Sequence, residues 1–289
     1  MITNRLEKGG RIDRTQPLTF YFNGVRYEGY AGDTLASALI DNGVSIVGRS
    51  FKLHRPRGIV GSGAEEPNAI LQIGTGSSTL PNQRATQVEL YDGLNARTVK
   101  GWPNINFDIA EVNDVFSRLL GAGFYYKTFM RPRALWHYYE RFIRRAAGMG
   151  ESPVEPDPDF YEHRNAHCDV LVAGAGPAGL MAVLAAARSG AEVIIADEQN
   201  EFGGQLLSSN EQIDERPATE WLREVVQQLA ALDNVTVLPR STVFGYFDQN
   251  FLTIAERCSD HLGEYQPGQI RQRQWRVRAK QVILAQGSF

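Results

Sequence analysis

The chain has little cysteine and no long apolar run. Its 289 residues contain only Cys168 and Cys258, too far apart in sequence to indicate a disulfide framework or a clustered metal site. No apolar stretch approaches the length needed to span a bilayer, and residues 1–14 lack the apolar core of a secretory signal. A net charge of -3 gives no electrostatic case for nucleic acid or an anionic membrane. We therefore expect a cytoplasmic protein.

Signatures of catalysis and metal binding are also scarce. No Ser-His-Asp signature or paired-carboxylate pattern can be argued from the spacing, so we assign no catalytic residue. His163, His167 and Cys168 lie close in sequence, but we predict no metal site because Cys168 opens a buried strand and no fourth ligand follows. Cys258 has only Arg257 beside it to activate a thiolate, which argues against a nucleophilic role.

The composition describes a globular chain long enough for two domains. Hydrophobic residues make up 43% and charged residues 22% of the sequence. The patterns below divide it into residues 1–110, a connector at 111–165 and a second domain at 166–289.

Residues 168–205 carry the pattern of a complete nucleotide-binding unit. The apolar run 170–173 predicts a buried strand, and Gly174, Gly176 and Gly179 follow it in G-x-G-x-x-G spacing. The first glycine permits a tight turn, the second lets the backbone approach a pyrophosphate, and the third lets helix and strand pack closely. The phosphates then bind at the positive end of the helix.

The rest of this unit follows in order. Residues 181–188 predict a helix that Gly190 ends, and the strand 193–196 leads to Asp197. A carboxylate roughly 20 residues after the glycines can accept hydrogen bonds from the adenosine ribose. Three glycines in an ordinary βαβ unit are the alternative, which we set aside because strand, glycines, helix, strand and acid occur in register.

The identity of the nucleotide is only partly restricted by these residues. Asp197 would repel a 2′-phosphate, and no arginine follows at positions 198–200 to pair with one. NADP is therefore disfavoured. NAD and FAD share the adenosine diphosphate, so both stay open.

The remainder of the second domain favours a flavoprotein type. A helix at 219–232 and a strand at 235–238 extend the sheet, and three β-like stretches follow at 242–247, 251–256 and 274–278. A last buried strand, 282–285, ends in a small-residue turn. We predict a Rossmann-type FAD/NAD(P)-binding domain with a β-meander, of glutathione-reductase type. Because the sequence stops at this turn, we expect an incomplete domain and a fragment.

The first region predicts a β-grasp. Stretches 18–22 and 25–30 alternate around Asn23-Gly24, a strong hairpin signal. Asp33 is placed to cap a helix at 34–41 that Gly43 ends, and a strand is expected at 69–73. In plant-type ferredoxins the corresponding loop carries cluster-binding cysteines. Residues 59–68 contain none, so we expect a ferredoxin-like domain without an iron–sulfur cluster.

The connector has two predicted helices, 113–120 and 133–147, and a proline-rich linker at 151–159. Leu135, Tyr139, Phe142 and Ala146 share one face of the second helix, with arginines elsewhere. Such a helix either binds a partner protein or packs on its own chain, and we favour packing. For the loop at His54, Arg55, Pro56 and Arg57, we likewise favour internal bonding or solvation over contact with an anionic partner.

The whole chain resembles the N-terminal part of the α subunits of heterotetrameric sarcosine oxidases. The stretches that carry the resemblance are RSFKLHRPRGI (49–59), AGFYYKTFM (122–130), the tryptophan-containing helix that follows, and GAGPAGL (174–180) with DEQNEFGGQL (197–206). AGFYYKTFM is specific, since generic nucleotide folds do not carry it.

The resemblance implies a complex that oxidises sarcosine with O2 to glycine, H2O2 and formaldehyde, or methylenetetrahydrofolate when tetrahydrofolate is the co-substrate. It implies a β subunit with FAD, an FMN between α and β, further γ and δ subunits, and a folate-binding domain C-terminal in α. In this chain it implies bound NAD without a turnover role. The cofactor contacts that follow by motif are Gly174, Gly176, Ala178, Gly179, Asp197, Glu198, Gly204, Gln205, Val243, Ala285, Gln286 and Gly287. Gln286 departs from the family's Ala-Thr-Gly turn.

Two other functions stay open. One is the FAD-carrying subunit of an amino-acid dehydrogenase resembling hydrogen cyanide synthase or opine oxidase, against which the missing loop cysteines argue. The other is a non-catalytic nucleotide-binding scaffold, whose β-grasp and aromatic helix bind a partner.

Overall fold

A computed structural model describes residues 4–118, 121, 123, 131–263 and 268–287. The chain forms two compact units, Met1–Pro158 and Asp159–Phe289, each described here by itself. AGFYYKTFM, apart from Gly123, lies outside the described residues. No helix in the described part is long and apolar enough to cross a membrane.

The first unit is built on a five-stranded mixed sheet with the order β2-β1-β7-β5-β6. β1 and β2 form the hairpin expected around Asn23-Gly24, whose φ angles of 51° and 80° are those of a type I′ turn. β1 runs parallel to β7, and helix α1 (Leu35–Asp41) contributes four buried residues to the core. Hairpin, helix and returning strands give the β-grasp order. The strands are β1 (Asp13–Phe22), β2 (Val25–Ala31), β5 (Ile70–Ile73), β6 (Leu80–Arg84) and β7 (Leu94–Arg97).

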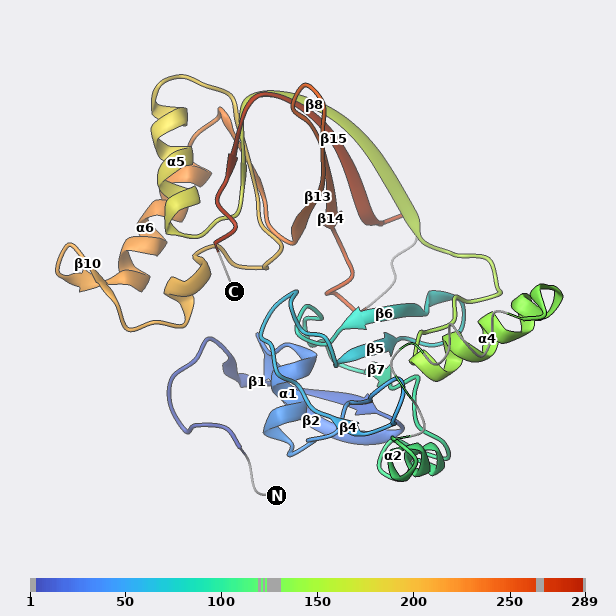
Figure 1. Ribbon diagram of the computed structural model, residues 1–289. Helices are drawn as coiled ribbons and strands as arrows, with labels where there is room; N and C mark the ends of the chain where they lie inside the picture. Colours follow the sequence, from blue (N-terminus) through green and yellow to red (C-terminus); the bar gives the residue numbers. More distant parts are fainter. Residues whose placement is uncertain (1–3, 119–120, 122, 124–130, 264–267, 288–289) are drawn as a thin grey trace. The chain divides into compact units, whose positions relative to one another are not determined.

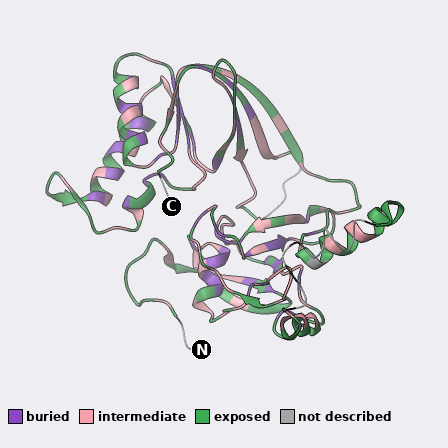
Figure 2. Cartoon of the chain, in the orientation of Figure 1, coloured by how far each residue is buried: buried purple, intermediate pink, exposed green. Residues whose placement is uncertain are grey.

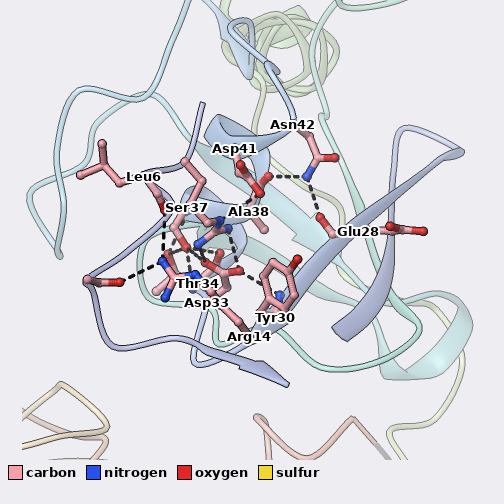
Figure 3. Close-up of polar contacts among 12 residues, drawn as sticks. Leu6, Arg14, Glu28, Tyr30, Asp33, Thr34, Ser37, Ala38, Asp41 and Asn42 are labelled. Carbon is pink, nitrogen blue, oxygen red and sulfur yellow. Dashed lines mark hydrogen bonds and ion pairs between the residues drawn. The ribbon is translucent and has the colours of Figure 1, made fainter. Parts of the chain in front are cut away.

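Helix α1 is capped one residue later than expected. Thr34 is the N-cap, and it forms a reciprocal capping box with Ser37. Asp33 precedes the cap, and its buried carboxylate accepts hydrogen bonds from the Ser37 hydroxyl at 2.6 Å and the Tyr30 N–H at 2.9 Å (Figure 3). Asp33 therefore fixes the entry into the helix instead of capping it.

A buried glutamate organises the loop between β4 (Pro56–Arg57) and β5. The Glu66 side chain is fully buried, and its carboxylate accepts four backbone N–H bonds, from Val60, Gly61, Asn68 and Ala69. Burial raises the pKa of this carboxyl, but the backbone hydrogen bonds outweigh it and the net pKa is lowered. An ionised carboxylate thus holds the loop closed.

The His54 loop is bonded within its own unit, as favoured from the sequence. His54 Nδ1 lies 2.6 Å from Asp108 Oδ2, and Arg55 Nε donates to Asp114 at 2.8 Å. Arg49, in the short strand β3 (Gly48–Arg49), is buried and donates to the Ile105 carbonyl at 2.8 Å.

The connector helices are partly described, and much of their surface is exposed. Of the first predicted helix, 113–120, residues 113–115 lie in α2 (Val112–Val115), residues 116–118 form a turn, and 119–120 lie outside the described residues. The second predicted helix becomes η3 (Arg133–Leu135) followed by α4 (Trp136–Ala147). Figure 2 shows α4 largely exposed, with Leu135 at 41% and Phe142 at 66% exposure. The favoured packing of this face on its own chain is therefore not seen for these two side chains, and the side chain of Ala146 lies outside the description.

The second unit is a six-stranded sheet with the order β12-β9-β8-β15-β14-β13. The four strands β12, β9, β8 and β15 are parallel, and β15, β14 and β13 form an antiparallel meander. Helices α5 and α6 lie together on one face (Figure 1). The elements are β8 (Phe160–Ala173), α5 (Pro177–Arg188), β9 (Val193–Ala196), η4 (Gly204–Leu207), α6 (Ala218–Ala230), β12 (Val235–Leu238), β13 (Ser241–Phe247), β14 (Phe251–Arg257) and β15 (Ile270–Leu284).

Successive side chains of the central strand β9 point to opposite faces of the sheet, and each face has its own hydrophobic core. Val193 and Ile195 of β9 face the helices, whereas Ile194 and Ala196 face the meander residues. All four are buried, which explains why the strand is continuously apolar.

One predicted division of the sheet is wrong. The third meander strand and the last buried strand, expected at 274–278 and 282–285, are parts of the single strand β15. β15 pairs antiparallel with β14 over 272–278 and parallel with β8 along most of its length. The two segments are continuous because β15 pairs along its length with β8, a strand of similar length.

Candidate dinucleotide-binding site

The predicted cofactor residues gather at one edge of the second sheet. The chain leaves β8 toward β9 and β12 on one side, and it returns through β15 on the other side of β8. Gly174 follows β8, Asp197 follows β9, and Ala285 follows β15. The order reverses between β8 and β15, and ligands of open parallel sheets bind outside the carboxyl ends of the strands at such a point.

Gly174 and Gly179 are required by close packing of the backbone. Gly174 has φ of +104°, and a Cβ there would lie 2.4 Å from the Ala285 carbonyl oxygen. A Cβ on Gly179 would lie 2.0 Å from the Gly174 carbonyl oxygen. Both glycines therefore perform the packing expected of the first and third positions in the motif.

Gly176 is unlike these two, because a Cβ there would meet no atom within 4 Å. It is the N-cap of α5, with Pro177 as the first helical residue and Ala178 exposed. The first N–H groups of a helix have no partner within it, and they attract anions. The structure thus leaves room for a phosphate at Gly176, where the motif predicts the pyrophosphate.

The segment 203–205 packs against the glycine-rich turn at 174–179. The Gly203 N–H donates to the Ala175 carbonyl at 2.9 Å, and a Cβ on Gly204 would lie 3.1 Å from Gly176 Cα. Gly204 has φ of +53°, and Gln205 is exposed at the start of η4. Gly204 and Gln205 are consequently brought to the phosphate end of the predicted site.

Asp197 joins the strand β9 to the glycine-rich turn. Its Oδ2 accepts the Ala175 N–H at 2.6 Å, and its Oδ1 accepts the Gln199 N–H at 2.9 Å. A carboxylate has about four lone-pair sites, so two bonds leave acceptor capacity for ribose hydroxyls. Asp197 and Glu198 are both partly exposed, as a ribose contact requires.

The remaining predicted contacts lie in the turn after β15 and in β13. The Ala285 N–H donates to the Ala173 carbonyl at 2.7 Å, so the turn 285–287 begins beside the glycine-rich turn. Gln286 and Gly287 are exposed, and Gly287 has φ of +74°. Val243 is partly buried in β13, two residues after Ser241, whose N–H donates to the Asp197 carbonyl at 2.7 Å.

Two arginines that the sequence analysis did not place reach the segment after Asp197. Arg257 Nη2 donates to the Glu198 carbonyl at 2.8 Å, and the Arg240 N–H donates to the Gln199 carbonyl at 2.9 Å. Arg257 is 59 positions from Glu198, so no local pattern could have indicated the contact.

The thiols are not activated. Burial is the main cause that raises the pKa of Cys168 and of Cys258 to about 11, so both are protonated at neutral pH. Across the described ranges, no three His, Cys, Asp or Glu side chains group so that they could hold a metal ion.

Comparison with known proteins finds relatives that are all α subunits of one oxidase. Sarcosine oxidase subunit alpha of Rhizobium meliloti (strain 1021) is 50% identical over 289 residues, which cover 100% of this chain and 29% of that protein. The subunit of Corynebacterium sp. (strain U-96) is 38% identical, over 96% of this chain and 24% of that protein. The chain is a relative of the sarcosine oxidase α subunits. It spans less than a third of their length, in their N-terminal portion.

Family and fold comparisons describe the second unit and the fold. The family "FAD dependent oxidoreductase" matches residues 169–254, which contain most of the candidate site. The crystal structure of L-proline dehydrogenase from P.horikoshii has a similar fold, with a TM-score of 0.57 and 17% identity over 98% of this chain and 42% of that one. The second unit is thus a Rossmann-like domain of the FAD-dependent oxidoreductase type.

One expectation from the sequence is corrected by these matches. The family "2Fe-2S iron-sulfur cluster binding domain" matches residues 15–101, which contradicts the expectation that the protein has no iron–sulfur cluster. That expectation considered only the loop thiols, whereas the family match covers the hairpin, helix and sheet that this sequence retains.

The residues present differ from the usual thiolate donor set. Residues 15–101 contain no cysteine, and the carboxylate of Glu66 takes the N–H groups of the corresponding loop. Thiolate ligation does not fit these residues.

Proposed function

We propose that this chain is the dinucleotide-holding N-terminal part of the α subunit of a sarcosine oxidase complex, a flavin-dependent amine oxidoreductase. The similarity over the whole chain to sarcosine oxidase α subunits supports the family assignment. The proposed complex oxidises sarcosine with O2 to glycine, H2O2 and formaldehyde, or to methylenetetrahydrofolate when tetrahydrofolate is present. Its β subunit carries FAD, FMN lies between α and β, and γ and δ complete a cytoplasmic heterotetramer.

Within this chain we propose bound NAD. The observation that carries the proposal is the meeting of three turns, at 174–179, 203–205 and 285–287, around the open helix end at Gly176. The diphosphate would lie at Gly176, Ala178 and Gly179 with Gly204 and Gln205. The other contacts proposed are Asp197 and Glu198 at the ribose, Val243 at the adenine, and Ala285, Gln286 and Gly287 at the terminal turn.

These residues bind and orient, and we assign none of them a proton transfer or a bond to substrate. NAD is a hydride carrier when bound, but the resemblance to the family gives it no turnover role. We accordingly place the amine oxidation on another subunit and expect the isolated chain to be inactive. The three-part division at 110 and 165 and the glutathione-reductase type remain part of this proposal.

The FAD-carrying subunit of an amino-acid dehydrogenase is the second candidate. The match of residues 169–254 to the FAD-dependent oxidoreductase family favours it, because FAD shares the adenosine diphosphate that the site would bind.

Nucleotide released from the purified protein tests the proposal. The full-length subunit, co-expressed with its partner chains, is denatured, and the supernatant is analysed by chromatography and mass spectrometry. We expect one NAD per α subunit, and no NAD from the matched Gly176→Ala variant. FAD in this site, identified by its visible absorption in the α subunit purified alone, would support the dehydrogenase instead. If the subunit contains and binds neither nucleotide, the proposal is wrong.

A further inference from the structure

The acidic segment at 197–200 is held in place by the meander. Three main-chain carbonyls of this segment accept hydrogen bonds from residues at the start of β13 and the end of β14. The Ser241 N–H donates to Asp197 at 2.7 Å, the Arg240 N–H to Gln199 at 2.9 Å, and the Arg257 guanidinium to Glu198 at 2.8 Å.

Arg257 is the only side chain in this set of three donors, and it is itself fixed. It ends β14, and its N–H donates to the Arg240 carbonyl at 3.0 Å. A hydrogen bond from a charged guanidinium is stronger than one between neutral groups. The bond therefore restrains the main chain of Glu198, the residue that follows Asp197.

Asp197 lies directly before the restrained carbonyl of Glu198. Its carboxylate bridges the Ala175 N–H of the glycine-rich turn and the Gln199 N–H of the acidic segment. A binding group has to be held within roughly 0.5 Å of its productive geometry, and a loop does this only when its neighbours fix it.

We propose that Arg257 is a positioning residue for the adenosine ribose. By fixing the Glu198 carbonyl it aligns the Asp197 carboxylate with the ribose hydroxyls. The assignment rests on the proposed function, because it requires a dinucleotide at this edge of the sheet. The assignment also gives the meander a role in binding, because Arg257 of β14 holds the acidic segment by a hydrogen bond.

The test compares ligands that differ only at the ribose. Binding of ADP and 2′-deoxy-ADP is measured by calorimetry on the full-length subunit after its nucleotide is removed, since NAD and FAD share the ADP group. Loss of a hydrogen bond to a charged acceptor weakens binding by roughly tenfold or more. We expect the wild-type protein to prefer ADP by that factor, and Arg257→Ala to reduce the preference toward one. Arg257→Lys, which can still donate to the carbonyl, should retain part of it.

Arg278→Ala is the matched control. Arg278 also donates from its guanidinium to main-chain carbonyls of the meander, those of Asp248 and Gln249, at 3.2 and 2.9 Å. Its removal should leave the preference for ADP unchanged. Circular dichroism of all variants verifies that they fold.

Several results would overturn the assignment. An equal loss of affinity for both ligands in Arg257→Ala would indicate a general structural role, and an unchanged preference would show no role. Selective loss of adenosine 2′,5′-bisphosphate binding would make Arg257 a 2′-phosphate ligand. Failure of the wild-type protein to bind ADP at all would reject the proposed function itself, which distinguishes that outcome from the others.

Discussion

Gly176 and Gly179 belong to one turn, but different neighbours constrain them. The Cβ position of Gly179 is occupied by a backbone carbonyl oxygen of Gly174, which cannot move away as a flexible side chain could. The Cβ position of Gly176 is open. The fold itself therefore requires glycine at position 179. At position 176 a side chain would obstruct only a bound ligand.

Alanine at these two glycines should consequently have separable effects. We expect Gly179→Ala to lower the free energy of unfolding by about 1–3 kcal/mol, as overpacking does, and to lose the bound nucleotide. We expect Gly176→Ala to change stability by less than about 1 kcal/mol, the cost of alanine where no neighbour obstructs it, while nucleotide binding is lost. Urea denaturation with assay of bound nucleotide separates the two. Equal destabilisation by both would contradict this account.

Lys100 makes the stability of the first unit depend on pH. The residue is 7% exposed, its Nζ lies 5.5 Å from the centroid of the Phe51 ring, and burial lowers its pKa from 10.5 to about 8 despite the attraction of Asp108. Between pH 8 and 10.5 the unfolded chain binds the proton and the folded chain does not. The free energy of unfolding therefore rises over this interval, by about 3 kcal/mol at 1.36 kcal/mol for each pH unit.

Lys100→Met should remove this increase and stabilise the protein at pH 7. Urea denaturation at pH 7, 8 and 9.5 measures it, with the exposed Lys8→Met as the control for general alkaline effects. A wild-type curve that falls between pH 8 and 9.5 relative to Lys100→Met would be incompatible with a buried lysine of lowered pKa.

Residue patterns predicted local backbone features well, whereas the role of these residues in cofactor binding stays a prediction. Asn23-Gly24, the three glycines and Asp197 each act through neighbours close in sequence or through a strand register that apolar periodicity reveals. Arg257 was not predicted because its contact depends on how the meander folds back, which no spacing encodes.

Among the elements, the N-terminal segment before β1 is fastened to helix α1. Arg5 forms a two-bond pair with Asp33 at 3.0 and 2.9 Å, lies 3.0 Å from Asp41, and covers the Tyr30 ring at 5.6 Å. The side chain of Asp33 is fully buried, and that of Arg5 is 16% exposed. Arg5 thus connects this segment to Asp33, just before α1, and to Asp41, the last residue of α1.

Arg5→Ala should lower the free energy of unfolding by about 3–5 kcal/mol, because it leaves a buried carboxylate without its cation. Arg14→Ala is the control, since Arg14 donates to exposed carbonyls of Leu6 and Gly9, and it should cost at most about 1 kcal/mol. Urea denaturation measures both variants. Similar effects of the two would contradict the importance of burial.

Element boundaries were harder to predict than element types. Thr34 replaces Asp33 as the cap because a capping box with Ser37 was available one residue later. The helix at 133–147 was expected to bury an aromatic face, but amphipathic periodicity does not specify what covers that face, and Phe142 is exposed. The meander was predicted correctly in its first two strands and divided wrongly in its third.

For the whole molecule, two units carry separate family signatures. Residues 15–101 match a cluster-binding domain and 169–254 an FAD-dependent oxidoreductase, and the connector between them matches neither. The resemblance to sarcosine oxidase α subunits was recognised from the sequence and is confirmed by 50% identity over the whole chain. The cluster expectation was wrong because it considered a single loop, whereas the match covers a complete domain.

The continuous strand β15 affects how the second unit can be dissected. Its 15 residues extend about 50 Å at 3.3 Å each, and they pair with β8 from Phe160 to Ala173. Strain applied to the meander is therefore transmitted along one backbone to the turn at 285–287, without a flexible hinge between them. A truncated gene that begins at residue 166, where the glycine motif suggests a domain start, would remove residues 160–165 of β8. Residues 270–276 of β15 would then lose their β8 partners and become a sheet edge, paired on the side of β14 alone. Such a product would be prone to aggregation, and a cut before Asp159 avoids it.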